Sequence, residues 1–370
     1  MPAASDTRSN PAMAKAQPQT AVVHALDSPE AKHRIESWLL IQCQARRLAV
    51  TNMTRLSGGA IQENWALTVA VTGGLHTGER EWVLRTDAAS AVAASLGRAQ
   101  EFAVLQVVHE AGMTVPQPLW LCTDPGILDR EFFIMEKISG VAAGHRLTRD
   151  ANLVPDPAAL GEALGANLAR LHTIRPPEPR LDFLPAAQSN HALAAIADYR
   201  AEFDLFDDSF PALEWGLRWC ELNAPAPMQN VLIHRDYRTG NYMVHDGQLT
   251  GVLDWEFTGW GDPREDIGWF MARCWRFSRP DRIAGGVADA ADFLRGYAKV
   301  SGTSFTLAEI KYWQVMAHLR WAVIALQQEA RHLSGREPSL ELALTGRLVA
   351  DLEFEILRLT GNEFVEGGHA

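Results

Sequence analysis

Cysteine is scarce in this sequence of 370 residues. Its four cysteines, at positions 43, 122, 220 and 274, lie far apart and form no Cys-x-x-Cys pair, which argues against a disulfide scaffold and against structural zinc. No apolar run approaches the roughly 18 residues of a membrane-spanning helix. We therefore expect a protein of a reducing compartment, the cytoplasm, with no membrane span.

The chain also lacks an excess of positive charge. Its formal net charge is −11, which argues against binding to nucleic acid as its main task. Hydrophobic residues make up 47% and charged residues 21% of the sequence, as in a soluble globular protein. Residues 1–20 are rich in Ala, Pro, Ser and Gln and have no apolar core like that of a signal peptide, so we expect a disordered tail there.

A hairpin is predicted in the most informative stretch of the chain, residues 231–266. Two apolar runs, Tyr242–Val244 and Leu249–Leu253, flank Asp246-Gly247, a dipeptide typical of a tight turn between antiparallel strands. A shorter apolar run just before them, Val231–Ile233, predicts a further strand.

Three oxygen-bearing side chains are predicted to meet at one end of this hairpin. Asn241 precedes the first strand and Asp254 follows the second, so antiparallel pairing returns Asp254 to the end at which Asn241 lies. Asp236 lies in the loop just before. Such a cluster suits Mg²⁺, a hard cation that takes a few protein oxygens and completes its shell with water and phosphate.

The motifs in this stretch resemble those of phosphate-transferring enzymes. Residues 234–241 match the catalytic-loop pattern His-Arg-Asp-x-x-x-x-Asn of protein kinases. Residues 254–256 read Asp-Trp-Glu where protein kinases have Asp-Phe-Gly, and Gly-Asp-Pro follows at 261–263. With these motifs the chain resembles the aminoglycoside phosphotransferase and choline kinase branch of the kinase-like superfamily, over about residues 35 to 360.

The resemblance implies an α+β, two-lobed protein-kinase-like fold. Residues 21–138 would form a small lobe with an antiparallel sheet that binds the nucleotide, and residues 139–370 a larger, mainly helical lobe that carries catalysis and the acceptor site. It also implies that Asp236 receives the proton of the acceptor hydroxyl. Asn241 and Asp254 would hold Mg²⁺ against the phosphates of ATP.

The same resemblance implies a nucleotide site in the small lobe. The loop with Gly58 and Gly59 would cover ATP, although adjacent glycines alone are more often a simple turn. Arg85 stands where protein kinases carry a phosphate-contacting lysine, and it supplies the charge as a planar fork. Glu101 lies on the apolar stripe of a helix over residues 95–110, and the expected partner of its carboxylate is Arg85. A surface arginine and a solvated glutamate are the alternatives.

The link between the lobes is expected near Ile138. Backbone groups of an apolar strand and link around Glu136 and Ile138 would hold the adenine edge. Here the side chains are not diagnostic, because the backbone makes the contacts.

Several polar residues are interpreted as structural. His234 is expected to bond the backbone near Asp254, and His172 to pack or to cap a helix. Asp262 and Glu265 look like the N-cap and the capping-box partner of a helix that begins with proline. Asp266 is interpreted as structural as well.

Helices are expected over most of the chain from Ile267 onward. Residues 311–333 form one predicted helix with a tryptophan-rich core. Leucines and an isoleucine spaced by three or four from Leu340 to Leu359 predict one further helix that ends at Gly361.

The predicted activity is phosphorylation, dependent on ATP and Mg²⁺, of a hydroxyl on a small molecule. GTP is an alternative donor. Aminoglycosides would suit the acidic chain, whereas relatives joined to acyl-CoA dehydrogenases make a hydroxyacyl compound a candidate, and choline-like or sugar acceptors stay open. Two other classes are weighed: a nucleotide-binding pseudoenzyme, favoured by Arg85, and a metal-dependent hydrolase, which would need a denser set of His and Asp.

Overall fold

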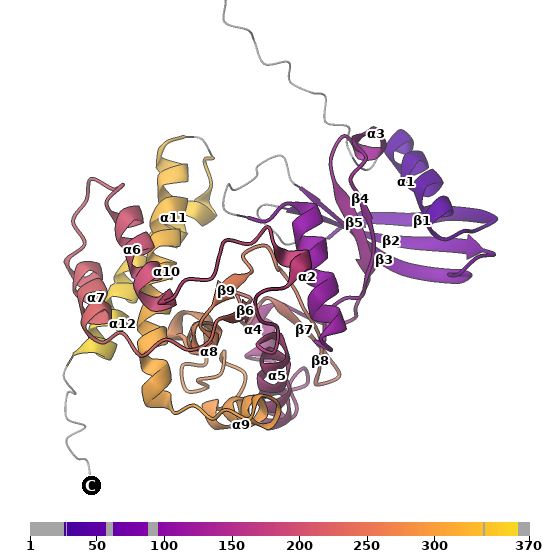
Figure 1. Ribbon diagram of the computed structural model, residues 1–370. Coiled ribbons are helices and arrows are strands. Elements are labelled where there is room, and N and C mark those ends of the chain that lie inside the picture. The colour runs from indigo at the N-terminus through magenta and orange to yellow at the C-terminus, as the bar shows by residue number, and fades with distance from the viewer. Residues whose placement is uncertain (1–25, 27, 57–61, 88–94, 336, 362–370) are drawn as a thin grey trace, which may run out of the picture.

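The computed structural model describes residues 26, 28–56, 62–87, 95–335 and 337–361. They form a smaller lobe around a five-stranded sheet and a larger, mainly helical lobe (Figure 1), which confirms the predicted two-lobed α+β architecture. The expected tail and the predicted loop residues Gly58 and Gly59 lie outside the described residues. No helix in these parts of the chain is both long and apolar enough to cross a membrane.

The smaller lobe is an antiparallel sheet with a helix on each side. Its strands lie in the order β1-β2-β3-β5-β4. Helix α2 lies between the sheet and the larger lobe, and α1 lies on the opposite side (Figure 1). The elements are α1 (Pro29–Gln42), β1 (Arg47–Arg55), β2 (Gln62–Thr72), β3 (Gly78–Asp87), α2 (Arg98–Glu110), β4 (Pro118–Cys122), α3 (Pro125–Leu128) and β5 (Phe132–Glu136).

Alternation along β3 determines which side chains face α2. Val83 packs with Phe102 of α2, whereas Trp82 and Leu84 belong to a separate core with α1. Successive residues of a strand point to opposite faces, so Arg85 shares the face of Val83 and is directed toward α2.

The larger lobe carries the predicted hairpin. Tyr242 pairs with Val252 and Met243 with Gly251 across β7 and β8, and β6 pairs with β9. The elements are α4 (Gly144–Leu147), α5 (Pro157–Leu171), η1 (Pro179–Leu181), α6 (His191–Phe203), α7 (Pro211–Leu222), β6 (Val231–Ile233), β7 (Tyr242–His245), β8 (Gln248–Val252), β9 (Gly259–Gly261), α8 (Pro263–Met271), η2 (Arg273–Trp275), α9 (Ala290–Ser301), α10 (Leu307–Leu333), α11 (Leu340–Gly346) and α12 (Val349–Thr360).

Helices α5 and α9 touch through glycines. A Cβ atom on Gly165 would lie 2.0 Å from the carbonyl oxygen of Phe293, and one on Gly296 would lie 2.1 Å from that of Glu162. Both distances are far below van der Waals contact, so only glycine lets the two backbones approach this closely.

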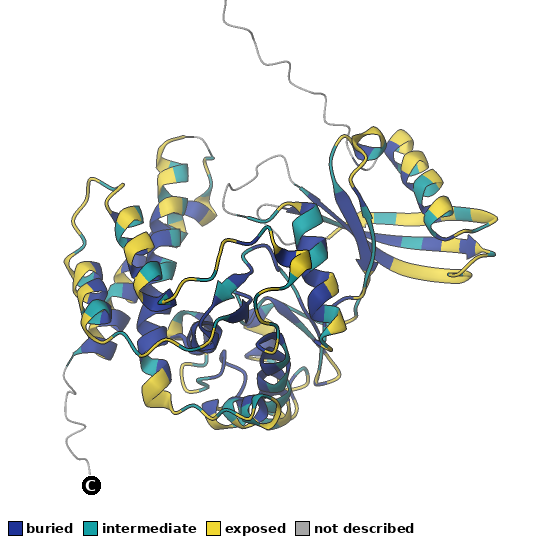
Figure 2. Ribbon diagram, in the orientation of Figure 1, coloured by how far each residue is buried: buried dark blue, intermediate teal, exposed yellow. Residues whose placement is uncertain are grey.

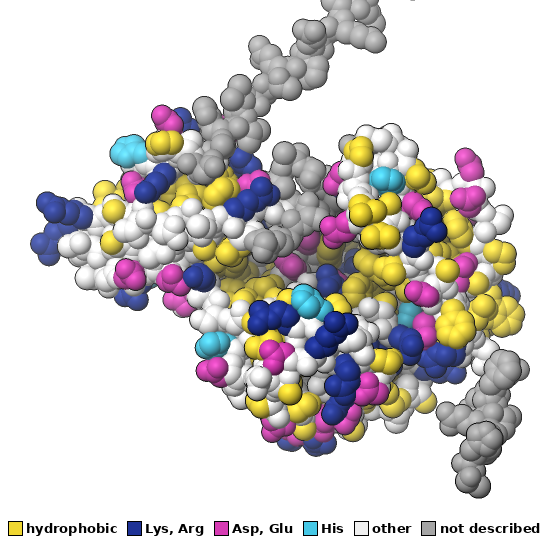
Figure 3. All heavy atoms as spheres, turned by 180° about the vertical axis from the view of Figure 1, so that it is seen from behind, with side chains coloured by type: hydrophobic (Ala, Val, Ile, Leu, Met, Phe, Trp, Pro, Cys, Tyr) yellow, Lys and Arg dark blue, Asp and Glu magenta, His cyan; other side chains and the backbone are white. Residues whose placement is uncertain are grey.

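The C-terminal helix is not continuous as predicted. The chain turns at Arg347 and Leu348, between α11 and α12. On the two sides of this turn the apolar stripe is buried differently: Leu340 and Leu344 of α11 are 75% and 58% exposed, whereas Ile356 of α12 is fully buried. The leucine spacing predicted one apolar face but did not predict the turn. Both α11 and α12 contact α10. Figure 3 shows hydrophobic side chains on the surface of this lobe.

The largest hydrophobic core belongs to both lobes. It joins Val83, Phe102 and Phe133 of the smaller lobe to Leu160 and Tyr242 of the larger one. Figure 2 shows buried residues on both sides of the junction. The lobes are therefore held together by apolar packing as well as by the link after β5.

Candidate active site

The loop between β6 and β7 is tied to α8 by one buried carboxylate. Asp266 accepts the backbone N–H groups of His234 at 2.7 Å and Arg235 at 2.8 Å, and it contacts Nε2 of His172 at 3.2 Å. Asp266 and His172 thus have the structural contacts expected of them. Held in this way, Arg235 adopts a φ of +64°, a left-handed conformation that is uncommon for a residue other than glycine.

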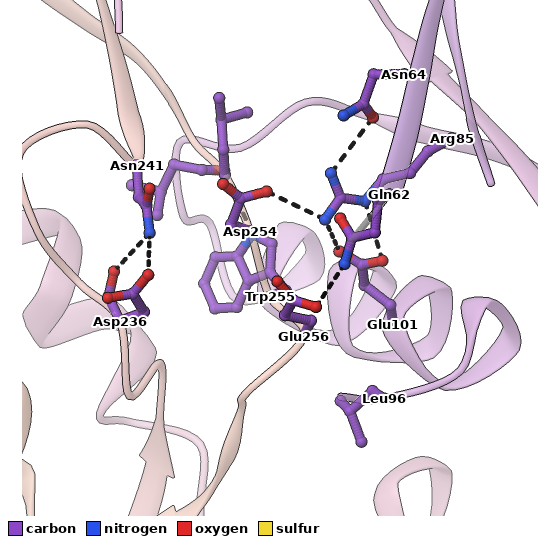
Figure 4. Close-up of polar contacts among 12 residues, drawn as sticks. Gln62, Asn64, Arg85, Leu96, Glu101, Asp236, Asn241, Asp254, Trp255 and Glu256 are labelled. Carbon is purple, nitrogen blue, oxygen red and sulfur yellow. Dashed lines mark hydrogen bonds and ion pairs between the residues drawn. The ribbon is translucent and has the colours of Figure 1, made fainter. Parts of the chain in front are cut away.

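Asp236 lies next in this loop, and its carboxylate is held by three side chains. Nε1 of Trp269 donates to Oδ1 at 2.9 Å, and Nε of Arg238 donates to the same atom at 3.0 Å. The amide of Asn241 donates to Oδ2 and to the Asp236 carbonyl. Figure 4 shows the amide oxygen of Asn241 turned away from Asp236.

Asp254 follows the second strand of the hairpin at the same end as Asn241. The N–H of Leu253 donates to the carbonyl of Asn241 at 2.8 Å, which confirms that Asn241 and Asp254 lie at the same end of the hairpin. The pairing itself is shifted by one residue from the predicted register, because a bulge lies between Met243 and Val244. His234 Nε2 donates to the carbonyl of Leu253 at 2.9 Å, which confirms its expected framework contact. The side chain of Asp254 is 35% exposed, so one side of the carboxylate is open to a ligand.

Arg85 connects the smaller lobe to this end of the hairpin. Its guanidinium contacts Glu101 at 2.8 Å, Asp254 at 3.1 Å and the side-chain oxygen of Asn64 at 3.3 Å (Figure 4). The predicted pairing of Arg85 with Glu101 is therefore confirmed. Burial opposes the charged form, but the carboxylates of Glu101 and Asp254 outweigh it and raise the pKa of Arg85 above its usual value.

A second contact between the lobes involves Glu256, which was not among the predicted site residues. Gln62 of β2 donates to its carboxylate at 2.7 Å (Figure 4). Burial raises the pKa of Glu256 to about 7, although Arg85 acts in the opposite direction. The sequence signal that could have identified Glu256 is its place in the Asp-Trp-Glu motif, two residues after the predicted metal ligand Asp254.

The predicted adenine-binding residues lie at the end of β5. The N–H of Glu136 donates to the carbonyl of Gln117 at 2.9 Å, and its side chain is exposed. Ile138 follows in the link that leads to α4.

The expected capping box at the start of α8 is only half right. Asp262 caps the helix by accepting the N–H of Arg264 at 3.0 Å. Glu265 does not reach back to the cap. Its carboxylate instead bonds to Nε2 of His191, which makes Glu265 part of a buried charged cluster. A pattern of spacing could not reveal this partner, which comes from α6.

The oxygens at the end of the hairpin suit a Mg²⁺ ion. Asn241 offers an amide oxygen and Asp254 a carboxylate, both hard ligands, and Mg²⁺ takes its other ligands from water and phosphate. Among the described residues, no group of three or more His, Cys, Asp and Glu could hold a metal ion by itself.

Comparison with known proteins agrees with this geometry. The model of the phosphotransferase enzyme family (APH) matches residues 52–302. Acyl-CoA dehydrogenase family member 11 of Pongo abelii is 24% identical over 281 residues, which are 72% of this chain. This chain spans only 35% of the length of that relative.

Solved structures share the whole fold. A Ralstonia eutropha protein described as an aminoglycoside phosphotransferase superposes with a TM-score of 0.68 at 20% identity, over 89% of this chain and 97% of that one. A mutant of aminoglycoside phosphotransferase APH(4)-Ia, in complex with ADP and hygromycin B, gives a TM-score of 0.55 at 17% identity, over 89% and 99%. These likenesses show a protein-kinase-like fold. Since the family model covers more than half of the chain, the protein belongs to the phosphotransferase enzyme family.

Proposed function

We propose that the protein transfers the γ-phosphoryl group of ATP, with Mg²⁺, to a hydroxyl of a small molecule. One observation carries this proposal: Asp236 and Asn241 meet Asp254 at the junction of the lobes, beside the pair of Arg85 and Glu101. A general base, two metal ligands and a cation for phosphate are the parts that phosphoryl transfer needs.

Asp236 orients the acceptor hydroxyl and accepts its proton. The bonds from Trp269 and Arg238 fix the carboxylate in one orientation before the acceptor binds. Because the transition state of phosphoryl transfer is loose, positioning of this kind supplies much of the catalysis.

Asn241 and Asp254 hold the metal ion, and Arg85 steadies the phosphates. When bound, Mg²⁺ neutralises the charge of the transferring phosphate. The backbone around Glu136 and Ile138 binds the base. ATP is the proposed donor; GTP is the alternative, which a competition assay decides.

The acceptor is a small molecule rather than a protein. Only a few residues separate Asp254 from the start of α8 at Pro263, and they include the three residues of β9. This leaves no long segment on which a peptide substrate would dock. Hygromycin B in the complex with APH(4)-Ia gives an example of a small-molecule ligand in this fold.

A second candidate function is nucleotide sensing without transfer. The observation that favours it is the engagement of Arg85, whose Nε, Nη1 and Nη2 each have a protein partner. Of the five N–H groups of the guanidinium only one, on Nη1, is left for a phosphate, and a phosphate that took a second would compete with Asp254, Glu101 or Asn64. A protein that uses nucleotide only as a ligand would tolerate this arrangement.

The two functions are separated by a transfer assay. Pure protein is incubated with Mg²⁺, γ-labelled ATP and a metabolite extract of the cells that express it. Label in a product, lost in Asp236→Asn, supports the kinase. ATP binding with no labelled product supports the sensor.

A further inference from the structure

Arginines surround the proposed base. Arg238 bonds to Asp236 directly, and Arg235 precedes it in the chain. Arg320 of α10 lies beside the same loop, next to Arg235. Its Nη1 donates to the carbonyl of Arg235, and its guanidinium lies 4.6 Å above the ring of Trp269, which itself donates to Asp236. Stacking on a tryptophan fixes the plane of Arg320 and keeps its charge beside the site.

The carboxylates around these arginines already have partners. Arg238 pairs with Asp236, and both Arg235 and Arg320 lie near Glu265. Asp266 accepts the backbone N–H groups of His234 and Arg235 and contacts His172. Glu265 is also bonded to His191. Burial alone would raise the pKa of Glu265, but His191, Arg235 and Arg320 hold it well below its usual value. Glu265 is therefore already committed as a counter-ion.

Arg235 is the arginine that is open to a ligand. Its side chain is 36% exposed, compared with 27% for Arg238, which is bonded to Asp236, and 12% for Arg320. Its Nε lies 3.6 Å from Oε1 of Glu265, too far for a hydrogen bond. Both of these atoms are buried without a hydrogen-bond partner among the described residues. Unsatisfied buried polar atoms are uncommon in folded proteins and often mark a ligand or water position.

The backbone of Arg235 also indicates a use for its side chain. Glycine would adopt a φ of +64° without strain, whereas a residue with a side chain does so at an energetic penalty. An arginine in such a conformation, next to the proposed base, is more easily explained by binding than by folding.

A small cavity adjoins this cluster. Its wall includes the charged side chains of Glu265 and Arg320 together with apolar side chains. Its lining consists of Tyr199, Glu265, Trp269, Trp313, Met316, Ala317 and Arg320. Nε1 of Trp313 is buried and unpartnered among the described residues too, so polar atoms without partners lie around one region.

We propose that the acceptor is a hydroxy compound with an anionic group, a carboxylate or a phosphate, which binds to the guanidinium of Arg235 with Arg320 behind it while its hydroxyl lies at Asp236. The planar fork of arginine matches both anions. A cationic acceptor such as an aminoglycoside would meet this arginine cluster with like charge. This inference rests on the proposed kinase function and narrows its substrate class.

The test separates a metabolite extract by charge before the transfer assay. Fractions that bind an anion-exchange resin, fractions that bind a cation-exchange resin and unbound material are each incubated with the full-length protein, Mg²⁺ and γ-labelled ATP. We expect Asp236-dependent label only with the anion-exchange fractions. Pretreatment of an active fraction with phosphatase, removed before the assay, abolishes labelling if the anion is a phosphate monoester and spares it if the anion is a carboxylate.

Variants of Arg235 test whether this residue binds the anionic group of the acceptor. Arg235→Gly removes the fork and relieves the backbone, so it is expected to fold, and it should raise the KM for the active fraction about 10- to 100-fold, the effect of one lost hydrogen bond to a charged group. The KM for ATP should stay within about twofold, since only the acceptor contact is removed. Arg235→Lys keeps the charge without the fork and should be intermediate. The matched control is Arg279→Ala, which removes a surface arginine paired with Asp281.

The outcomes separate the two proposals. Label only in unbound or cation-exchange fractions would overturn the anionic acceptor and leave the kinase intact. An unchanged acceptor KM in Arg235→Gly would also overturn it. Absence of label in every fraction, with ATP binding intact, would overturn the kinase proposal and this inference with it.

Discussion

Nη2 of Arg85 donates to Oδ1 of Asp254 at 3.1 Å across the junction of the lobes, although the two residues are 169 positions apart in the chain. The contact places Arg85 of the smaller lobe, the candidate for phosphate binding, against Asp254 of the larger lobe, the candidate for metal binding. The proposed nucleotide site is thus built from two segments that are distant in the sequence.

Asp236→Asn should abolish transfer while it leaves nucleotide binding intact. The amide keeps the shape of the carboxylate but cannot accept the acceptor proton, so kcat should fall by about 10²- to 10⁴-fold. Calorimetric titration with MgATP should give a dissociation constant close to that of the wild type. Wild-type turnover in this variant would rule out Asp236 as the base.

Asp254→Asn should weaken nucleotide binding that depends on Mg²⁺. The side chain keeps its size and loses the charge that attracts the cation, so we expect a loss of affinity of about tenfold or more, which corresponds to about 1.4 kcal/mol. Removal of Mg²⁺ with EDTA should give the wild-type protein the same low affinity. Equal affinities of the two proteins in Mg²⁺ would contradict the metal role of Asp254.

Arg85→Met should destabilise the fold. It leaves Glu101, 2% exposed, without one of its two arginine partners, and removing one member of a buried ion pair typically costs about 3–5 kcal/mol. The retained contact of Glu101 with Arg98 should keep the loss near the lower end. Urea denaturation measures it. The matched control, Arg55→Met, breaks an exposed pair with Glu63 and should cost less than about 1 kcal/mol.

His318 should make the protein sensitive to acid. Burial lowers its pKa to about 4, although its bond to the carbonyl of Gln314 acts in the opposite direction. Between pH 6.5 and 4 the unfolded chain binds a proton at this position and the folded chain does not, so stability is present above pH 6.5 and is lost on acidification, by at most about 1.4 kcal/mol per pH unit.

The measurement is the free energy of unfolding against pH for the wild type and His318→Gln. The variant starts from a lower stability, because it loses packing, but its curve should be flatter in this window. Parallel curves would show that His318 does not contribute.

Gly165→Ala should destabilise the larger lobe. The added methyl group would overlap the carbonyl of Phe293, and forcing α5 and α9 apart should cost about 1–3 kcal/mol or more. The midpoint of thermal unfolding reports this. Gly112→Ala is a useful contrast, because an added Cβ there meets no atom within 4 Å and only its φ of +79° is unfavourable.

Local patterns predicted the centre of the site well. The turn at Asp246-Gly247 predicted an antiparallel hairpin, and antiparallel pairing brings Asn241 and Asp254 to the same end, although the bulge between Met243 and Val244 was not foreseen. The helical stripe with Glu101 likewise predicted a buried carboxylate that needs a cation. In both cases the determining interactions are short in sequence or follow from one periodicity.

The surroundings of Asp236 were not predictable in this way. Trp269, 33 residues further along the chain, bonds to Asp236. Arg320, 84 residues further along, bonds to the neighbouring Arg235 and stacks on Trp269, and nothing in the local pattern at Asp236 indicates either residue. For the same reason Glu265 was interpreted as a cap, although its partner His191 lies 74 residues earlier. Such contacts depend on how the helices pack, which spacing along one segment does not determine.

The hydrophobic core that runs through both lobes has a consequence for the behaviour of the chain as a whole. Residues of β3, β5 and α2 complete the same core as residues of α5 and β7. If the chain were divided after Ile138, each piece would expose apolar surface that the other now covers. We therefore expect the two lobes to unfold together in a single cooperative transition, and neither piece to be stable when produced alone.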